Sequence, residues 1–130
     1  MGPRLSIVGL VVLAGCASTP SQVSYSLPAP NPNGCYVFVF DRPEWQGARV
    51  LLNGPDKRWN LERLLLNEED WRNRIRSIDV GPAATLSVFT DLRFTGVSRR
   101  FGPGSKAARL DADINARIES LELQCAAIKQ

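Results

Sequence analysis

Residues 39–47 read VFDRPEWQG, and residues 88–96 read VFTDLRFTG, at an offset of 49 positions. Each stretch places a second aromatic residue five positions after the first, and a glycine two positions after that. In the first copy these residues are Phe40, Trp45 and Gly47, and the second copy repeats the spacing. Self-similarity at a fixed period indicates a repeated supersecondary unit. The sequence therefore predicts a domain built from two copies of one motif.

The similarity continues downstream of these stretches. Residues 52–55 (LNGP) match residues 101–104 (FGPG) at the same offset of 49. Residues 75–80 (IRSIDV) match residues 118–123 (IESLEL) at an offset of 43. The first copy therefore carries about six additional residues in its middle.

The additional residues of the first copy predict a short helix. Asn60 is a favoured helix N-cap residue, and leucines at positions 61, 64 and 65 follow at helical spacing, with Trp71 further on. In the second copy, residues 111–115 predict only a shorter turn.

The rest of both copies is patterned as β-strands. Short runs rich in aromatic and β-branched residues, and strict alternation in the last run of each copy, are typical of strands. The alternation puts Ile75 on the face opposite Ile78 and Val80, and it pairs that second face with Leu121 and Leu123 in the core. The predicted strands are residues 36–40, 48–52 and 75–80 in the first copy and residues 85–89, 97–101 and 118–123 in the second.

Two copies of aromatic-x4-aromatic-x-Gly, each followed by a serine before an apolar strand, resemble the βγ-crystallin Greek-key domain. The resemblance covers roughly residues 35–125, with motifs at about 35–81 and 84–125, and leaves residues 126–130 as a C-terminal tail. It implies an all-β sandwich of two Greek-key motifs, with the short helix in the first motif. The alternative is another small all-β sandwich whose halves are similar by chance.

The resemblance also implies roles for matching residues in the two motifs. Gly47 and Gly96 should take a positive φ in a folded-over first hairpin, which glycine adopts at little cost. Ser77 and Ser120 should bond back to that hairpin. The paired aromatic residues should pack at the hairpin corner.

Many microbial members of that family bind Ca²⁺ through Asn/Asp-Asn/Asp-x-x-Ser/Thr-Ser in each motif, and hard oxygen ligands suit Ca²⁺. Residues 72–77 read RNRIRS and residues 115–120 read NARIES, so Arg76 and Glu119 stand where a hydroxyl is needed. The three arginines of the first copy oppose a divalent cation. We therefore expect no cofactor and no intact pair of calcium sites; Asn115 and Glu119 are the candidates for a single weak site.

Cys35 and Cys125 bracket the predicted domain. An even pair of cysteines in an exported protein indicates a disulfide. The bridge would close a loop of about 90 residues, to which chain entropy assigns roughly 4–5 kcal/mol. Two buried free thiols are the alternative.

Residues 1–15 predict an export signal. Arg4 supplies a positive charge, and residues 5–13 are apolar apart from one serine, a run shorter than the ~20 residues that span a bilayer. Residues 13–16 read LAGC, which resembles the lipobox of bacterial lipoproteins. In that class the cysteine, here Cys16, receives a diacylglyceryl group and the signal is cut just before it. The alternatives are an ordinary secretory signal followed by a cysteine, or a buried apolar strand.

Residues 16–34 are predicted to form the lipidated N-terminus and a flexible tether. Residues 17–34 hold four prolines and no charge, which favours neither a core nor a regular helix. Ala17, where an Asp favours inner-membrane retention in enteric-type lipoproteins, resembles the outer-membrane default. The predicted location is the cell envelope, anchored to the lipid bilayer through Cys16 in the outer membrane, and facing the periplasm or the cell surface.

Composition narrows the function. The 130 residues include no His, which removes His-based catalysis and His metal ligands. The formal net charge is +3 and the basic residues are scattered, so nucleic-acid binding is not indicated. Asp111 and Asp113 are either paired carboxylates or a solvated loop pair. The chain is therefore not predicted to be an enzyme.

The remaining function classes are a structural or binding module of the envelope and, as an alternative, a protease inhibitor that uses an exposed loop. Residues 99–100 or residues 53–59 could supply that loop. Trp59 is either an exposed anchor or a half-buried side chain under the loop. The predicted partner is an unidentified envelope or extracellular protein.

Overall fold

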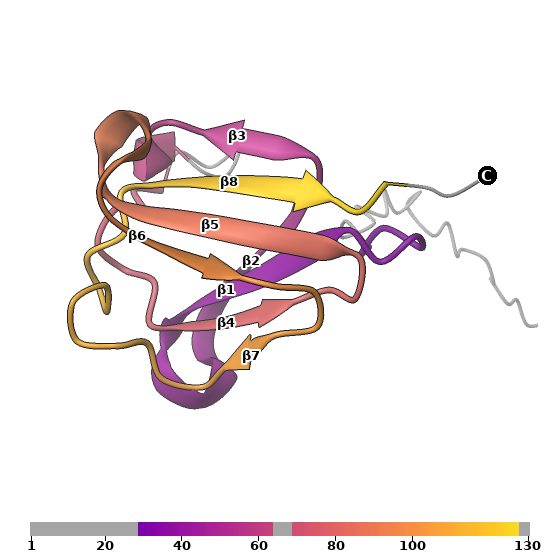
Figure 1. Cartoon of the computed structure of the whole chain (residues 1–130). Helices are drawn as coiled ribbons and strands as arrows, with labels where there is room; N and C mark the ends of the chain where they lie inside the picture. The colour runs from indigo at the N-terminus through magenta and orange to yellow at the C-terminus, as the bar shows by residue number, and fades with distance from the viewer. Residues whose placement is uncertain (1–28, 64–68, 128–130) are drawn as a thin grey trace, which may run out of the picture.

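The computed structural model describes residues 29–63 and 69–127, which form two four-stranded antiparallel sheets (Figure 1). One sheet has the strand order β2-β1-β4-β7 and the other has the order β3-β8-β5-β6. The strands are β1 (Tyr36–Arg42), β2 (Gln46–Asn53), β3 (Asp56–Arg58), β4 (Ser77–Val80), β5 (Ala84–Asp91), β6 (Thr95–Phe101), β7 (Lys106–Ala107) and β8 (Ser120–Cys125); the 3-10 turns are η1 (Pro43–Trp45), η2 (Leu61–Arg63) and η3 (Leu92–Phe94). The predicted signal and Cys16, the predicted site of lipidation, lie outside the described residues.

Each motif lends its third strand to the sheet of the other motif. β7, from the second motif, pairs with β4 of the first, and β3, from the first motif, pairs with β8 of the second. Figure 1 shows these two exchanged strands at opposite sides of the molecule, β3 beyond β8 and β7 beyond β4. The predicted all-β sandwich of two Greek-key motifs is therefore confirmed, and neither sheet is complete without the other motif.

No α-helix occurs in the described part of the chain, so the predicted short helix is wrong. Asn60 does accept the Glu62 backbone N–H at 2.9 Å, but it opens only the three-residue turn η2. Leu61 is fully buried and its carbonyl accepts the Trp71 N–H at 2.9 Å. Leu61 and Trp71 are therefore both buried in the core without lying on one face of a common helix. The leucines at positions 64 and 65 lie outside the described residues.

None of the described segments forms a helix long and apolar enough to cross a membrane.

The turn predicted in the second motif is confirmed, because the N–H groups of Ile114 and Asn115 both donate to the Asp111 carbonyl, at 3.0 and 2.8 Å.

The last strand of each motif begins two residues later than predicted, at Ser77 and at Ser120. Alternation alone would put Ile75 opposite Ile78, yet both side chains are fully buried. Ile75 precedes the strand, and its carbonyl accepts the Ala116 N–H of the other motif at 3.0 Å. The segment before β4 therefore crosses the end of the sandwich, where the two-residue alternation of a strand does not apply.

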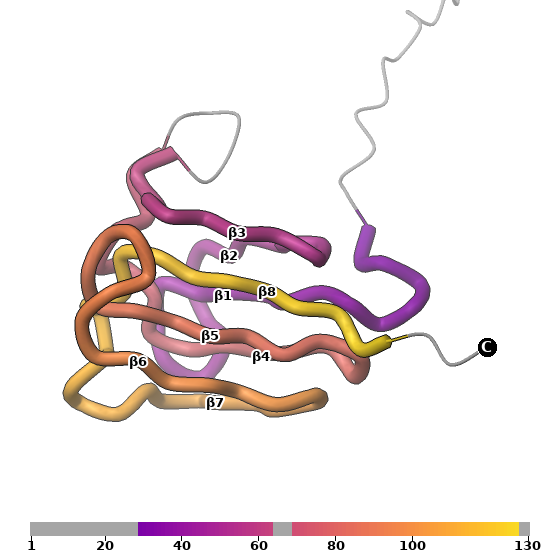
Figure 2. The backbone as a smooth tube through the Cα atoms, turned by 45° about the horizontal axis from the view of Figure 1, so that its top comes forward, coloured from indigo at the N-terminus to yellow at the C-terminus, as the bar shows by residue number. Residues whose placement is uncertain are grey.

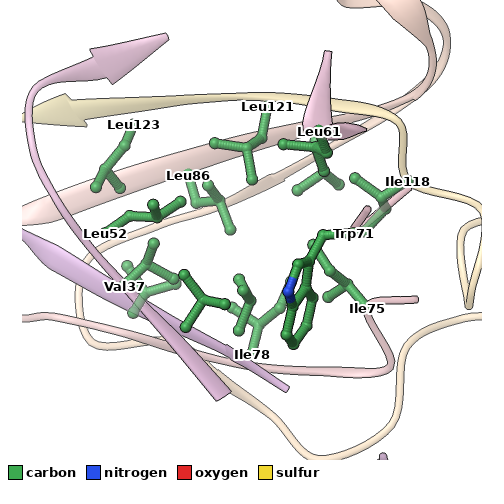
Figure 3. Close-up of a cluster of buried hydrophobic side chains, with 14 of the residues drawn as sticks. Val37, Leu52, Leu61, Trp71, Ile75, Ile78, Leu86, Ile118, Leu121 and Leu123 are labelled. Carbon is green, nitrogen blue, oxygen red and sulfur yellow. The ribbon is translucent and has the colours of Figure 1, made fainter. Parts of the chain in front are cut away.

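The core lies between the two sheets and contains the predicted residues Ile78, Leu121 and Leu123 (Figure 3). The predicted core residue Val80 is buried as well. The largest fully buried side chain is Trp71, which is 1% exposed. Among the described residues, its indole N–H has no hydrogen-bond partner, although burying an unpaired donor usually costs about 1–3 kcal/mol. The indole therefore acts as an apolar filler at the end of the core.

A disulfide joins Cys35, just before β1, to Cys125, at the end of β8, with 5.3 Å between the Cα atoms. The bridge links a strand of one sheet to a strand of the other. Gly54 packs against it so closely that a Cβ there would lie 3.1 Å from the Cys125 sulfur. The disulfide thus closes the same end of the sandwich at which the chain enters and leaves the domain.

The chain just before Cys35 is folded against the domain. The Asn31 N–H donates to Asn53 Oδ1 at 2.8 Å, and the Asn31 side-chain amide donates to the carbonyls of Cys35 and Gly54, both at 3.1 Å. The last residues assigned to the tether, 29–34, therefore include Asn31, which is hydrogen-bonded to the domain. Composition alone missed the packing of one asparagine against the β2–β3 turn.

Two substitutions of Trp71 can distinguish the contribution of its packing from that of its indole N–H to the unfolding free energy. Trp71→Ala should cost about 3–5 kcal/mol of unfolding free energy, because it empties a fully buried site. Trp71→Phe should cost clearly less than Trp71→Ala, because it keeps a ring in the site, leaves a smaller cavity and removes the unpaired N–H. Urea unfolding with the disulfide intact measures both. A Phe variant as unstable as the Ala variant would show that the indole N–H has a stabilising partner.

Candidate functional site

Each motif folds its first hairpin over through backbone in the left-handed region. Gly47 has a φ of +80° and Gly96 a φ of +85°. A Cβ on Gly47 would overlap the Asp41 carboxylate, and one on Gly96 would lie 2.5 Å from Thr90 Oγ1. Conformation and space therefore both require glycine here.

A buried serine hydroxyl holds each folded hairpin. Ser77 Oγ donates to the Arg42 carbonyl at 2.6 Å and accepts the Trp45 N–H at 3.0 Å. Ser120 Oγ makes the same pair of bonds one motif later, to the Asp91 carbonyl at 2.6 Å and from the Phe94 N–H at 3.0 Å. Both serines are fully buried, so neither hydroxyl is accessible to a substrate.

The aromatic corners differ between the motifs. Phe94 meets Phe89 edge to face, with 5.7 Å between the ring centroids. Trp45 instead donates its indole N–H to the Ile78 carbonyl at 3.0 Å, and Lys106 of the exchanged strand β7 lies 5.8 Å from its ring centroid. In the first motif the corner residue therefore also contacts the strand that the other motif supplies.

The segments that resemble calcium motifs meet across the approximate two-fold relation between the motifs. The Asn73 N–H donates to the Ile118 carbonyl at 2.9 Å, and the Ala116 N–H donates to the Ile75 carbonyl at 3.0 Å. Glu119 Oε1 accepts from the Asn73 side-chain amide at 3.3 Å. The carbonyls of Ile75 and Ile118 are thus already hydrogen-bonded.

The structure does not join the two residues singled out for a weak calcium site. Glu119 contacts Asn73 of the other motif, whereas the Asn115 backbone N–H donates to the Asp111 carbonyl at 2.8 Å. The exposed Arg76 of the first motif is equivalent to Glu119 of the second. The Arg76 N–H donates to the Phe40 carbonyl, and the Glu119 N–H donates to the carbonyl of Phe89, which is the equivalent of Phe40.

Arginines hold the carboxylates near this junction. Arg74 pairs with Asp41 at 3.1 Å, and its guanidinium lies 4.3 Å from the Trp71 ring centroid. Arg72 pairs with Asp70 at 2.7 Å, and these hydrogen bonds hold the pKa of the Asp70 carboxyl below its ordinary value. The described residues contain no group of three or more His, Cys, Asp or Glu side chains placed to hold a metal. This donor set, with its carbonyls and carboxylates engaged, does not fit Ca²⁺.

The two candidate catalytic carboxylates flank one arginine. Arg99 Nε lies 3.7 Å from Asp111, and a terminal nitrogen of the same guanidinium bonds Asp113. Both carboxylates are solvent-exposed, and each pairs with Arg99. The geometry therefore supports the interpretation of Asp111 and Asp113 as a solvated loop pair.

Residues 53–59 are not a free loop, because Asp56–Arg58 form strand β3 on β8. Trp59, which follows that strand, is 52% exposed. It borders a surface hollow of about 560 Å³ that sequence reasoning did not predict. The hollow is lined by Asp56, Lys57, Arg58, Trp59, Asn60, Glu62 and Arg63.

The described domain is similar to solved structures that have the same two-motif architecture. A βγ-crystallin domain from Flavobacterium johnsoniae is 19% identical, with a TM-score of 0.61, and the match covers 72% of this chain and 98% of that one. A domain from work on the evolution of the eye lens βγ-crystallin domain fold is 23% identical, with a TM-score of 0.63, covering 77% and 95%. The domain has the βγ-crystallin fold.

The N-terminal domain of protein S is a further relative by structure, at 22% identity and a TM-score of 0.61, covering 72% of this chain and 99% of that one. No family model matches the chain, and no curated protein matches it. Identities of 19–23% support the βγ-crystallin fold and not a shared ligand. The expected fold is confirmed, and the function has to be inferred from the residues of this chain.

Glycine substitutions can separate the two constraints on the hairpins. Gly96→Ala should lower the unfolding free energy by more than about 1–2 kcal/mol, because it adds a clash to the cost of a positive φ. Gly104→Ala should cost about 1 kcal/mol, since Gly104 has a φ of +74° and open space around it. Gly102→Ala, with open space and no positive φ, is the control. Urea midpoints that do not follow this order would contradict the folded-hairpin account.

Calcium is expected to have little effect on stability. With a dissociation constant of about 1 mM or weaker, 1 mM Ca²⁺ would add about 0.4 kcal/mol, so the melting temperature should rise by less than about 3 °C over the value in EDTA. Differential scanning calorimetry measures this, with 1 mM Mg²⁺ as the control. A calcium-specific rise of many degrees would restore the calcium site that the arginines argue against.

Proposed function

We propose that this chain is a non-catalytic lipoprotein of the bacterial cell envelope, whose βγ-crystallin-fold domain is a structural or binding module. The observation that carries the proposal is the sequence LAGC at residues 13–16, at the end of an apolar run that follows Arg4. Acyl groups on Cys16 would attach the domain to the bilayer, in the outer membrane and facing the periplasm or the cell surface.

The disulfide supports a location outside the cytoplasm. Cys35 and Cys125 are bonded to each other, and such structural bridges persist in oxidising compartments such as the periplasm. With these two cysteines in the bridge, Cys16 is left as the one cysteine available for a lipid. The cysteine usage of the whole chain is therefore consistent with an exported and anchored protein.

The absence of catalysis is supported by how the reactive groups of the described domain are used. Ser77 and Ser120 are buried in hairpin hydrogen bonds, and the sequence holds no His to activate a hydroxyl. Asp111 and Asp113 pair with Arg99. These groups serve the fold, and the proposal assigns none of them a chemical step.

The exposure of Trp59 favours a binding role over a purely structural one, because an exposed aromatic side chain beside a hollow is typical of a recognition site. The protease-inhibitor alternative has less support. Arg99 is engaged by two carboxylates, and much of residues 53–59 is paired in β3. Neither segment has the freely presented backbone that an inhibitory loop offers to a protease.

The lipid anchor can be tested directly. Mass spectrometry of the mature protein should find a diacylglyceryl group on Cys16 as the first residue, and Cys16→Ser should move the protein from the membrane fraction to the soluble fraction or leave it uncleaved. Ser18→Ala, two residues beyond the LAGC sequence, is the matched control and should stay anchored. A Cys16→Ser protein that is cleaved at the same bond and still membrane-bound would refute the anchor.

A further inference from the structure

In both motifs the residue just after the third strand accepts a backbone hydrogen bond from the hairpin of the other motif, but the side chain at this position differs. The Arg93 N–H of the second hairpin donates to the Trp59 carbonyl at 2.9 Å, and the Glu44 N–H of the first hairpin donates to the Ala108 carbonyl at 2.7 Å. Trp59 and Ala108 are therefore equivalent, 49 residues apart. Since alanine meets the needs of the fold at one position, the indole at the other is not required by the fold.

The Trp59 side chain lies at the hollow that borders the end of strand β3. Figure 2 shows β3 at the outer edge of its sheet beside β8, with the short turn η2 after it. The volume of about 560 Å³ falls within the range of roughly 300–1,000 Å³ common for ligand sites. The hollow lies on the motif that carries the extra residues.

The lining of the hollow is polar and its charges are largely paired. Arg58 Nε lies 2.9 Å from Asp56 Oδ2, and Lys57 lies 3.7 Å from Glu122 on the neighbouring strand. Asn60 Oδ1 accepts the Glu62 N–H at 2.9 Å. Because these charges already have partners within the protein, a strongly charged ligand is disfavoured, whereas the mixture of carboxylate, amide and guanidinium groups offers both acceptors and donors to hydroxyl groups.

Trp59 is the one large apolar surface in this lining, and it is held in place. The Arg93 guanidinium lies 5.6 Å from its ring centroid, and a cation over an aromatic face restrains the ring. A protein or peptide anchor would need apolar walls on several sides of a pocket. A sugar ring needs less: one flat aromatic surface for its C–H face and polar groups around the rim for its hydroxyls.

We propose that this hollow binds a neutral oligosaccharide, with one sugar ring stacked on Trp59 and its hydroxyls hydrogen-bonded to the polar side chains around it. The inference deepens the binding role proposed above and rests on it, but it does not depend on the lipid anchor. An exposed, shallow site of this kind should bind with a dissociation constant of about 0.1–1 mM.

The test is isothermal titration calorimetry of the full mature chain, in a detergent without a sugar headgroup, against three probes: the β-1,4-linked tetramers of N-acetylglucosamine and of glucose, and maltotetraose. At least one probe should bind. Trp59→Ala should weaken that binding about tenfold or more while the domain stays folded, because Ala108 already occupies the equivalent position. Val97→Ala, at an exposed apolar residue on strand β6, is the control and should bind like the wild type.

Trp59→Tyr keeps a flat ring of smaller area and should lose only a few-fold in affinity, which guards against an unfolded Ala variant. No heat from any of the three probes up to about 10 mM, or binding that survives Trp59→Ala unchanged, would overturn the proposal. The anchor is scored separately, since the mass of the mature N-terminus does not depend on the titration. A lipidated protein that binds no probe would therefore refute the oligosaccharide site and leave the envelope location standing.

Discussion

One buried hydroxyl per motif is the contact on which each half of this domain depends. Ser77 and Ser120 each donate to one backbone carbonyl and accept one backbone N–H of a hairpin that has folded away from its strand ladder. Without the hydroxyl, two polar backbone groups would be buried unpaired, at about 1–3 kcal/mol each. Because the serine is also the first residue of β4 or of β8, the same bonds set where the last strand of each motif begins.

The exchange of third strands makes the two motifs interdependent. β7 completes the sheet of the first motif and β3 completes that of the second, and the residue just after each exchanged strand accepts a hydrogen bond from the hairpin of the other motif. The Cys35–Cys125 bridge joins the sheets once more at the opposite end. Removing either motif would leave the other with an open sheet edge and an unsupported hairpin, so we expect the domain to unfold as one unit.

Against this duplicated backbone, the places where the two copies differ are the places where chemistry can be specific to this protein. Arg76 and Glu119 share a backbone position and carry opposite charges, which breaks the pattern that a pair of calcium sites would need. Trp59 and Ala108 share another, and the tryptophan borders a hollow. The fold requires the shared residues, whereas the binding role that we propose rests on an unshared one.

The sequence by itself determined the two motifs, the cysteine pair and the alternating core positions, because each depends on spacing within a short stretch or on comparison of the two copies. The roles of the hairpin glycines and serines came from the resemblance to the βγ-crystallin domain. Tertiary structure decided the rest. Leucine spacing after Asn60 suggested a helix, but burial of Leu61 and Trp71 in a shared core allows only a short turn. Ile75 is buried and Glu119 meets Asn73 because segments about 45 residues apart cross at the end of the sandwich. The hollow at Trp59 likewise exists only once β3 has crossed to the other sheet, since no local pattern records which strand a segment will pair with.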